Sequence, residues 1–412
     1  RQPMRRFLGK LAIVALTLLG ATLLLAMLAT DGKPSVERSE AISPNAVAQA
    51  KRLLAANDPR QQQRGEVRTV VVPASLLDEG VNYLAGRYLR GRGALRLQED
   101  GADIALSVAL PARRFLNLQA VVAPAEGMPR IASAHLGSLP VPAPLVESAV
   151  KHAISAYGFE KEWEMAAQAL RDISFDATGK TASLTYAWEP GILDRARAVA
   201  QSEADIKRLR ESQLSLAALL AHRAPGTRIS LADVLQATIP TSEDASLRGR
   251  ATLLILASHL AGKDLAAVVP AARNWPRVRW VNITLAGRHD LAQHFVISAA
   301  LAAWAGEPVA DAIGLYKELE DARHGSGFSF IDLAADRAGT RFGDILIRNP
   351  EQLMTAMNTA FHDEQLLPTV SDLPEYLYQP EFKRRFDNPE SPQFKAMAAE
   401  IERRLDTLPL YR

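Results

Sequence analysis

The segment from His289 to Gly343 constrains the fold most strongly, because it combines runs of small residues with charged side chains at helical spacing. Alanine dominates residues 298–303, and alanine and glycine recur between Ala335 and Gly343. Small side chains allow the backbones of neighbouring helices to approach closely. We therefore expect three short helices in this segment that pack tightly against one another.

Each of these expected helices carries polar residues three or four positions apart, a spacing that places their side chains on one helix face. The residues concerned are Asp290 and His294 in the first helix, Lys317, Glu318 and Asp321 in the second, and Asp332 and Asp336 in the third. The turn before the third helix contains Gly325, Ser326, Gly327 and Ser329. The glycines are typical of a turn, and Ser329 is placed to cap the helix that follows.

Three interpretations of these polar residues are open. In the first, Asp290, His294, Lys317, Glu318, Asp321, Asp332 and Asp336 form a buried network that fixes how the helices dock, since buried charges are costly unless they are paired. In the second, the oxygen and nitrogen atoms of His294, Glu318, Asp321 and Asp332 bind a metal ion, although neither a Glu-x-x-His nor a His-Glu-x-x-His spacing supports it. In the third, Glu318 and Asp321 are the acid and base of a hydrolase acting on a glycan or an ester, with His294 as a further catalytic candidate.

The same segment contains an ordered set of short motifs. They are Asp290-Leu-Ala-Gln-His-Phe295, Ser298, Ile313-Gly314, Lys317-Glu-Leu319, Asp321, Arg323, Gly325-Ser-Gly-Phe-Ser329, Asp332-Leu-Ala334, Asp336, Ala338 and Gly339. In these positions, residues 289–343 closely resemble a family of small periplasmic lipoproteins typified by YfiM, whose biochemical function is unknown. The resemblance implies a location in the cell envelope and a block that folds as a unit, and it assigns no catalytic residue. This chain differs from that family in having an apolar run near its start instead of a lipidated cysteine.

That apolar run extends from Leu11 to Ala29 and follows the basic residues Arg5, Arg6 and Lys10. As a helix it is long enough to cross the roughly 30 Å hydrocarbon core of a bilayer. We expect residues 7–29 to contact the membrane as an uncleaved signal anchor; the alternative is a cleaved signal peptide, but residues 26–30 lack an Ala-x-Ala cleavage site. Basic residues before the span favour a cytoplasmic N-terminus, which places the bulk of the chain in the periplasm of a Gram-negative cell, attached to the inner membrane.

Residues 65–190 predict an α+β module. Ser75 precedes Asp78 by three residues and predicts a capped helix to about Leu89, and four apolar runs separated by turns predict an antiparallel meander over 94–136. A Gly137-Ser-Leu-Pro-Val-Pro142 turn leads into the next helix, and the runs Asp172–Asp176 and Lys180–Trp188 predict a β-hairpin. In this order, residues 65–157 resemble membrane-anchored extracytoplasmic domains related to tubular lipid-binding folds. The resemblance implies a helix cradled in a curved sheet, with an apolar groove for an acyl chain; the alternative is a closed core.

Overall, the pattern predicts an α+β fold class with an N-terminal transmembrane helix, an α+β module and a mainly helical module. The expected segments are 1–31 (cytoplasmic tip and anchor), 32–64 (tether and short helix), 65–190 (α+β module), 191–285 (helical module), 286–348 (the YfiM-like block) and 349–412 (C-terminal helical tail). Within the helical module, His259 is expected to be buried with a hydrogen-bonded partner.

Composition narrows the function classes. The chain has 412 residues, 48% of them hydrophobic, so it has enough material for cores. The formal net charge of +2 does not suggest a nucleic-acid partner, and the lack of cysteine excludes disulfides, thiolate metal sites and cysteine nucleophiles. We expect no cofactor. The main expectation is a protein that binds or organises an envelope lipid or a membrane-protein partner, with a periplasmic hydrolase and a scaffold subunit of a membrane complex as alternatives.

Overall fold

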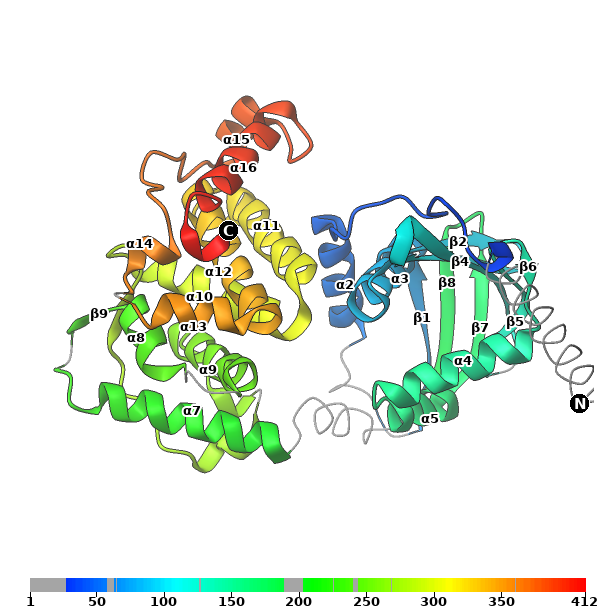
Figure 1. Ribbon diagram of the computed structural model, residues 1–412, viewed down its shortest axis with the longest axis horizontal. Helices are drawn as coiled ribbons and strands as arrows, with labels where there is room; N and C mark the ends of the chain where they lie inside the picture. The colour runs from blue at the N-terminus through cyan, green and yellow to red at the C-terminus, as the bar shows by residue number, and fades with distance from the viewer. Residues whose placement is uncertain are drawn as a thin grey trace, which may run out of the picture. The chain divides into compact units, whose positions relative to one another are not determined.

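The computed structural model describes residues 27–57, 63, 65–125, 127–188, 203–224, 226–239, 244–267, 269–359 and 361–412. The fold is mixed, with antiparallel sheets and many helices (Figure 1), as the sequence predicted. All but the last three residues of the predicted span at 7–29 lie outside the described part. Among the described residues, no helix combines the length and the apolarity needed to cross a membrane.

The chain divides into two compact units, which are described separately. Unit 1 comprises residues 1–40 and 49–197, and unit 2 comprises residues 41–48 and 198–412. The division passes through helix α2 (Pro44–Ala56).

The described part of unit 1 contains two antiparallel sheets and three helices after α2. Its elements are β1 (Val67–Pro73), α3 (Ala74–Leu89), β2 (Gly91–Gln98), β3 (Gly101–Leu110), a short 3-10 helix η2 (Pro111–Arg113), β4 (Arg114–Ala123), β5 (Arg130–Leu136), β6 (Leu139–Pro140), α4 (Ala143–Ala156), α5 (Glu160–Ala169), β7 (Leu170–Asp176) and β8 (Thr181–Ala187).

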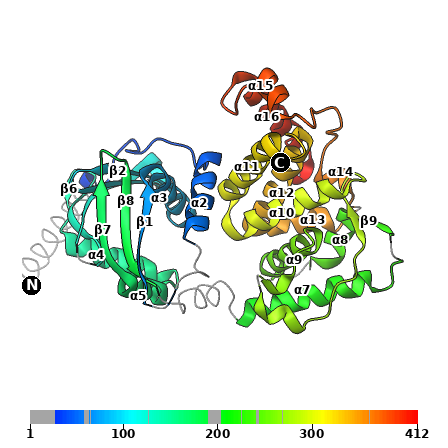
Figure 2. The same ribbon diagram turned by 180° about the vertical axis from the view of Figure 1, so that it is seen from behind.

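The predicted meander is confirmed. Strands β2 to β6 pair in sequence order to form one sheet. The second sheet has the order β1-β8-β7, and its strands run side by side in Figures 1 and 2. The β7–β8 hairpin was expected from the sequence. The pairing of β1 with β8 joins segments that are far apart in the chain.

The predicted cap of α3 is wrong. The helix begins at Ala74 with Pro73 in the N-cap position, and the hydroxyl of Ser75 donates to Gln49 Oε1 at 3.1 Å. Strand β1 continues to Pro73, so Ser75 already lies inside the first turn. The carboxylate of Asp78 instead accepts the backbone N–H of Leu95 at 2.7 Å and thereby ties α3 to β2.

Both sheets of unit 1 have an apolar face that is only half-buried. Across the larger sheet, Leu106 pairs with Leu118, which pairs with Leu136, and all three side chains are of intermediate exposure. In the smaller sheet, Val70, Leu184 and Ile173 are paired in the same way and are also half-buried.

Helices cover these faces in part only. Helix α3 packs on β2, where a Cβ added to Gly93 would lie 2.8 Å from the carbonyl oxygen of Val81. Helix α4 packs on β5 through Val146, against Ala120 and Ala134. The fully buried apolar residues in the described part of unit 1 are alanines, two valines and Trp188. This interior therefore lacks the large buried leucines and phenylalanines that normally fill a closed core.

Unit 2 is mainly helical. Its elements are α7 (Glu203–Ala221), β9 (Arg228–Ser230), α8 (Leu231–Thr238), α9 (Ala245–Leu260), η3 (Leu265–Ala267), η4 (Pro270–Asn274), β10 (Asn282–Thr284), α10 (His289–Ala305), α11 (Glu307–His324), α12 (Phe330–Arg348), α13 (Pro350–Met357), α14 (Asp363–Leu366), α15 (Gln379–Phe386), α16 (Pro392–Leu405) and η5 (Pro409–Tyr411). Strands β9 and β10 form a short parallel pair.

One continuous hydrophobic core joins α7 to the C-terminal η5. Helix α10 lies inside it and contacts α9, α11 and α12. The predicted boundaries at 285/286 and 348/349 fall within this unit. The expectation for His259 is wrong on both points, because the residue is only half-buried and its buried Nε2 atom has no hydrogen-bond partner among the described residues, although its ring lies against Trp280.

Candidate functional site

Helices α10 and α12 cross in direct backbone contact. A Cβ added to Gly339 would lie 2.0 Å from the carbonyl oxygen of Phe295, and one added to Gly343 would lie 2.2 Å from that of Ala299. Only glycine fits at such positions. The predicted close approach of small residues is therefore confirmed for this pair of helices, and it brings side chains of α10 next to those of α12.

His294, Glu318, Asp332 and Asp336, here called the acid–histidine cluster, meet between α10, α11 and α12. His294 Nδ1 lies 3.2 Å from Asp336 Oδ1, and Ser298 donates its hydroxyl to the same oxygen at 2.8 Å. His294 is 9% exposed and Asp336 is 5% exposed. Four of the seven helix-spaced polar residues predicted from the sequence therefore converge in the folded protein.

Glu318 is the most deeply buried member of the cluster, at 1% exposure. Its Oε2 accepts the backbone N–H of Ser329 at 3.1 Å, and its Oε1 lies 4.0 Å from His294 Nδ1. Lys317 Nζ lies 3.4 Å from Glu318 Oε1 and 2.9 Å from Asp321 Oδ2. Asp321 thus pairs with the half-exposed Lys317 at the rim.

Asp332 is held at the start of α12. Ser329 caps this helix as predicted, because its side chain accepts the backbone N–H of Asp332 at 3.0 Å. The Asp332 carboxylate remains available for other contacts, and its Oδ2 lies 3.7 Å from His294 Nε2. His294, Glu318 and Asp332 each offer a possible metal-ligand atom, and these atoms lie within 4.8 Å of one another.

Asp290 joins a second group that the sequence did not reveal. Arg288 forms ion pairs with Asp290 and with Glu375, each at 2.5 Å, and lies 3.9 Å from Asp332. The carboxylates of Asp290, Asp332 and Glu375 also have oxygen atoms within 4.8 Å of one another, but the guanidinium of Arg288 already lies beside them. Glu375 lies far along the chain, so spacing could not have identified it. Ser298 was part of the YfiM-like motif but had no assigned partner.

Burial and neighbouring charges shift the pKa values of the cluster. Burial alone lowers the pKa of His294, but the charge and hydrogen bond of Asp336 outweigh it and raise the pKa to about 9. Burial, together with the charge of Asp336, raises the pKa of Glu318 to about 7. Burial also raises the pKa of Asp332. For Lys317, burial opposes the charged form, yet the nearby Glu318 and Asp321 raise its pKa.

Two carboxylate oxygens of the cluster are buried without a hydrogen-bond partner among the described residues: Asp332 Oδ1 and Asp336 Oδ2. Asp336 Oδ2 faces α11 at Gly314, where an added Cβ would lie 3.0 Å from it. Buried carboxylate oxygens normally have hydrogen-bond donors or a cation beside them. This part of the site therefore has unused capacity to bind a donor or a cation.

The glycine-rich turn has a structural role. Gly327 has a φ of +96°, and a Cβ there would lie 2.7 Å from the backbone of Tyr376. Phe328 pairs with Leu377 through both of its backbone groups. Ser326 and Gly325 are exposed, and no base among the described residues forms a hydrogen bond with the Ser326 hydroxyl.

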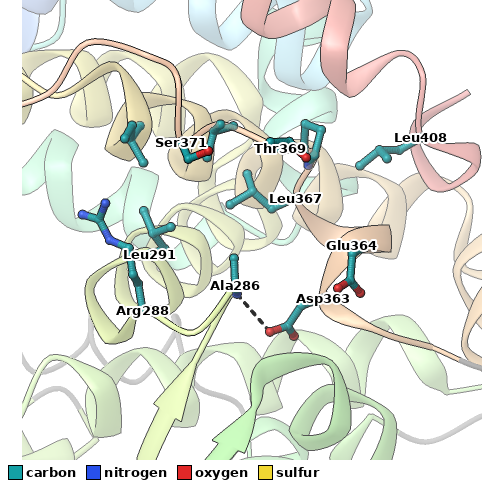
Figure 3. A pocket seen from close by; sticks show the side chains of 12 residues that line it. Ala286, Arg288, Leu291, Asp363, Glu364, Leu367, Thr369, Ser371 and Leu408 are labelled. Carbon is teal, nitrogen blue, oxygen red and sulfur yellow. Dashed lines mark hydrogen bonds between the residues drawn. The ribbon is translucent and has the colours of Figure 1, made fainter.

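A cleft of about 610 Å³ lies beside the second group. Figure 3 shows Arg288 and Leu291 on one side of it and Asp363 and Glu364 on the other. Asp363 accepts the backbone N–H of Ala286 at 3.0 Å, drawn as a dashed line in Figure 3. The four members of the acid–histidine cluster do not line this cleft.

Comparison with known proteins identifies no relative. No family model matches the chain, and no significant match is found among the curated proteins or the solved structures. The resemblance of residues 289–343 to YfiM-like lipoproteins, and that of residues 65–157 to tubular lipid-binding domains, therefore remain predictions.

Proposed function

We propose that this chain is a single-span inner-membrane protein whose periplasmic unit 1 binds an acyl chain of an envelope lipid. The anchor and its orientation rest on the apolar run and the basic residues before it. The binding activity rests on one structural observation: the apolar faces of both sheets in unit 1 are half-buried, and no leucine, isoleucine or phenylalanine in its described part is fully buried.

The half-buried apolar faces of unit 1 favour an apolar ligand. Apolar surface that stays in contact with water forgoes about 25 cal/mol per Å² of stabilisation. A row such as Leu106, Leu118 and Leu136 gains that stabilisation when an acyl chain covers it. Each buried methylene of the ligand adds about 0.8 kcal/mol. An acyl chain therefore suits this interior better than a polar ligand does.

The hydrolase alternative receives less support from the geometry. Glu318 is 1% exposed and bonded to a backbone amide, so a glycan or ester has no direct access to its carboxylate in this conformation. Asp321 is paired with Lys317. The scaffold alternative draws on apolar residues exposed on the outside of unit 1, such as Val71 and Leu145, and the experiment below distinguishes it from lipid binding.

The test begins with the full chain extracted in a mild detergent. Native mass spectrometry is expected to show a population that carries a bound phospholipid or fatty acid. Titration with a fluorescent fatty acid is expected to saturate, and added phospholipid is expected to displace the probe. The absence of both a bound lipid and saturable uptake contradicts the proposal. A stoichiometric protein partner in place of lipid supports the scaffold alternative instead.

A matched pair of substitutions in β4 locates the binding surface. Leu118 lies on the apolar face of the sheet, and the adjacent Gln119 is exposed on the opposite face. Leu118→Lys places an ammonium against the acyl chain and is expected to weaken binding by about tenfold or more, whereas Gln119→Lys leaves it unchanged. Equal effects of the two substitutions contradict binding at this face. Circular dichroism confirms that both variants are folded.

A further inference from the structure

The acid–histidine cluster of unit 2 has the composition and spacing of a metal site. The ligand atoms of His294, Glu318 and Asp332 lie within 4.8 Å of one another and come from three different helices. Zinc-type ions sit about 2.0–2.2 Å from nitrogen and carboxylate ligands, which places those ligands roughly 3–4 Å apart. The His294 Nε2 to Asp332 Oδ2 distance of 3.7 Å is already in that range.

Asp336 orients the imidazole for such a role. When a metal ion displaces the Nε2 proton, the remaining proton on Nδ1 is donated to Asp336 Oδ1 at 3.2 Å, and Nε2 offers its lone pair on the side of Asp332. The Ser298 hydroxyl holds the same carboxylate oxygen from α10. A carboxylate that fixes the tautomer of a ligating histidine is a recurrent feature of metal sites.

Charge supplies an independent argument. The buried carboxylates of Glu318 and Asp336 and the half-buried one of Asp332 surround His294, and Asp336 Oδ2 and Asp332 Oδ1 lack hydrogen-bond partners among the described residues. Lys317 Nζ lies 3.4 Å from His294 Nε2 and 3.4 Å from Glu318 Oε1, so an ammonium lies beside the two ligands in this structure. The Lys317 side chain is 52% exposed and also pairs with Asp321 at 2.9 Å, so its ammonium keeps a partner at the rim when a metal ion takes its place beside His294 and Glu318.

We propose that His294, Glu318 and Asp332 bind one divalent transition-metal ion, with Asp336 as the positioning residue for His294. One imidazole and two carboxylates suit Zn²⁺, Mn²⁺ or Fe²⁺. Asp321, part of the ligand set considered from the sequence, is not a ligand, because it belongs to the Lys317 pair at the rim. Asp290 and Glu375 do not contribute to a second metal site, because each of them already forms an ion pair with Arg288 at 2.5 Å.

The test uses the full chain in detergent, stripped with a chelator and then titrated with Zn²⁺ and with Mn²⁺ by isothermal calorimetry. Saturable binding of one ion per chain is expected for at least one of the two metals. Asp332→Asn is expected to weaken binding by about 100-fold and Asp336→Asn by about 10–100-fold, the range typical of residues that support a ligand. Both substitutions preserve side-chain shape, and the Ser329 cap uses only the backbone of Asp332.

Asp321→Asn is the matched control. It removes the same charge from α11 one turn after Glu318, and it is expected to change metal affinity by less than about threefold, since the side chain is not a ligand. An X-ray absorption spectrum of the zinc-loaded wild type, which needs no variant, is expected to show one imidazole among oxygen ligands. The proposal is overturned if neither metal binds saturably, if Asp332→Asn binds as tightly as the wild type, or if the spectrum shows no imidazole. Any of these results leaves the cluster as an internal network that docks the helices.

Discussion

Gly339 tests how the helices of the acid–histidine cluster are held together. In Gly339→Ala the new Cβ would lie 2.0 Å from the carbonyl oxygen of Phe295, whereas ordinary contacts begin at 3.4 Å. The obstacle is backbone, which cannot rotate away as a side chain does. Helices α10 and α12 must therefore move apart at this crossing by more than an ångström.

The expected cost has three parts. Overpacking a tight contact costs about 1–3 kcal/mol, and replacing glycine by alanine in a helix returns about 1 kcal/mol. Separation of the helices also weakens the two bonds to Asp336 from His294 and Ser298, and hydrogen bonds to charged groups are worth roughly 1.5–3 kcal/mol each. We expect a net loss of about 3 kcal/mol in the free energy of unfolding of unit 2.

Equilibrium urea unfolding of the full chain, followed by circular dichroism and tryptophan fluorescence, measures this loss. Gly80→Ala in α3 is the control, because nothing lies within 4 Å of its added Cβ. It is expected to leave unit 2 unchanged and to stabilise unit 1 by up to about 1 kcal/mol. If Gly339→Ala is as stable as the wild type, the argument that glycine is required at this crossing is refuted.

Three further predictions concern unit 2. Burial lowers the pKa of His259, so as the pH falls the unfolded state binds a proton before the folded state does, and stability decreases below about pH 6.5. His259→Phe is expected to reduce the difference in unfolding free energy between pH 7 and pH 5, as measured by urea unfolding. An unchanged difference contradicts this explanation. Asp363 accepts hydrogen bonds from a serine hydroxyl and two backbone amides. Asp363→Ala is therefore expected to lower the free energy of unfolding by about 2 kcal/mol in urea unfolding. The neighbouring substitution Glu364→Ala is expected to leave the free energy of unfolding unchanged. A hydrogen bond from Arg404 lowers the pKa of Asp372 to about 2, so this pair stabilises the fold above about pH 4 and loses its effect as the pH falls toward 2. The substitution Arg404→Gln is expected to raise the Asp372 pKa to about 4, as measured by NMR titration. A pKa that stays low in the variant would show that Arg404 is not the cause.

Local patterns in the sequence determined much of this structure. The four strands of the meander, the β7–β8 hairpin and the Ser329 cap depend on neighbouring residues, and each was predicted correctly. The convergence of His294, Glu318, Asp332 and Asp336 was also anticipated, because helical spacing and small residues between helices limit how three adjacent helices can pack. The membrane span, the envelope location and the YfiM-like resemblance remain predictions.

Long-range contacts decided the rest. Pairing of β1 with β8, the position of Glu375 beside Arg288, and the packing of the YfiM-like block into one core with the segments around it all join residues distant in the chain. The start of α3 was mispredicted for the same reason, since Ser75 and Asp78 have partners outside their helix. The spacing of residues along a chain indicates which side chains share a helix face. The free energy of burying charged side chains depends on the residues that pack against that face, and only the tertiary structure specifies those residues.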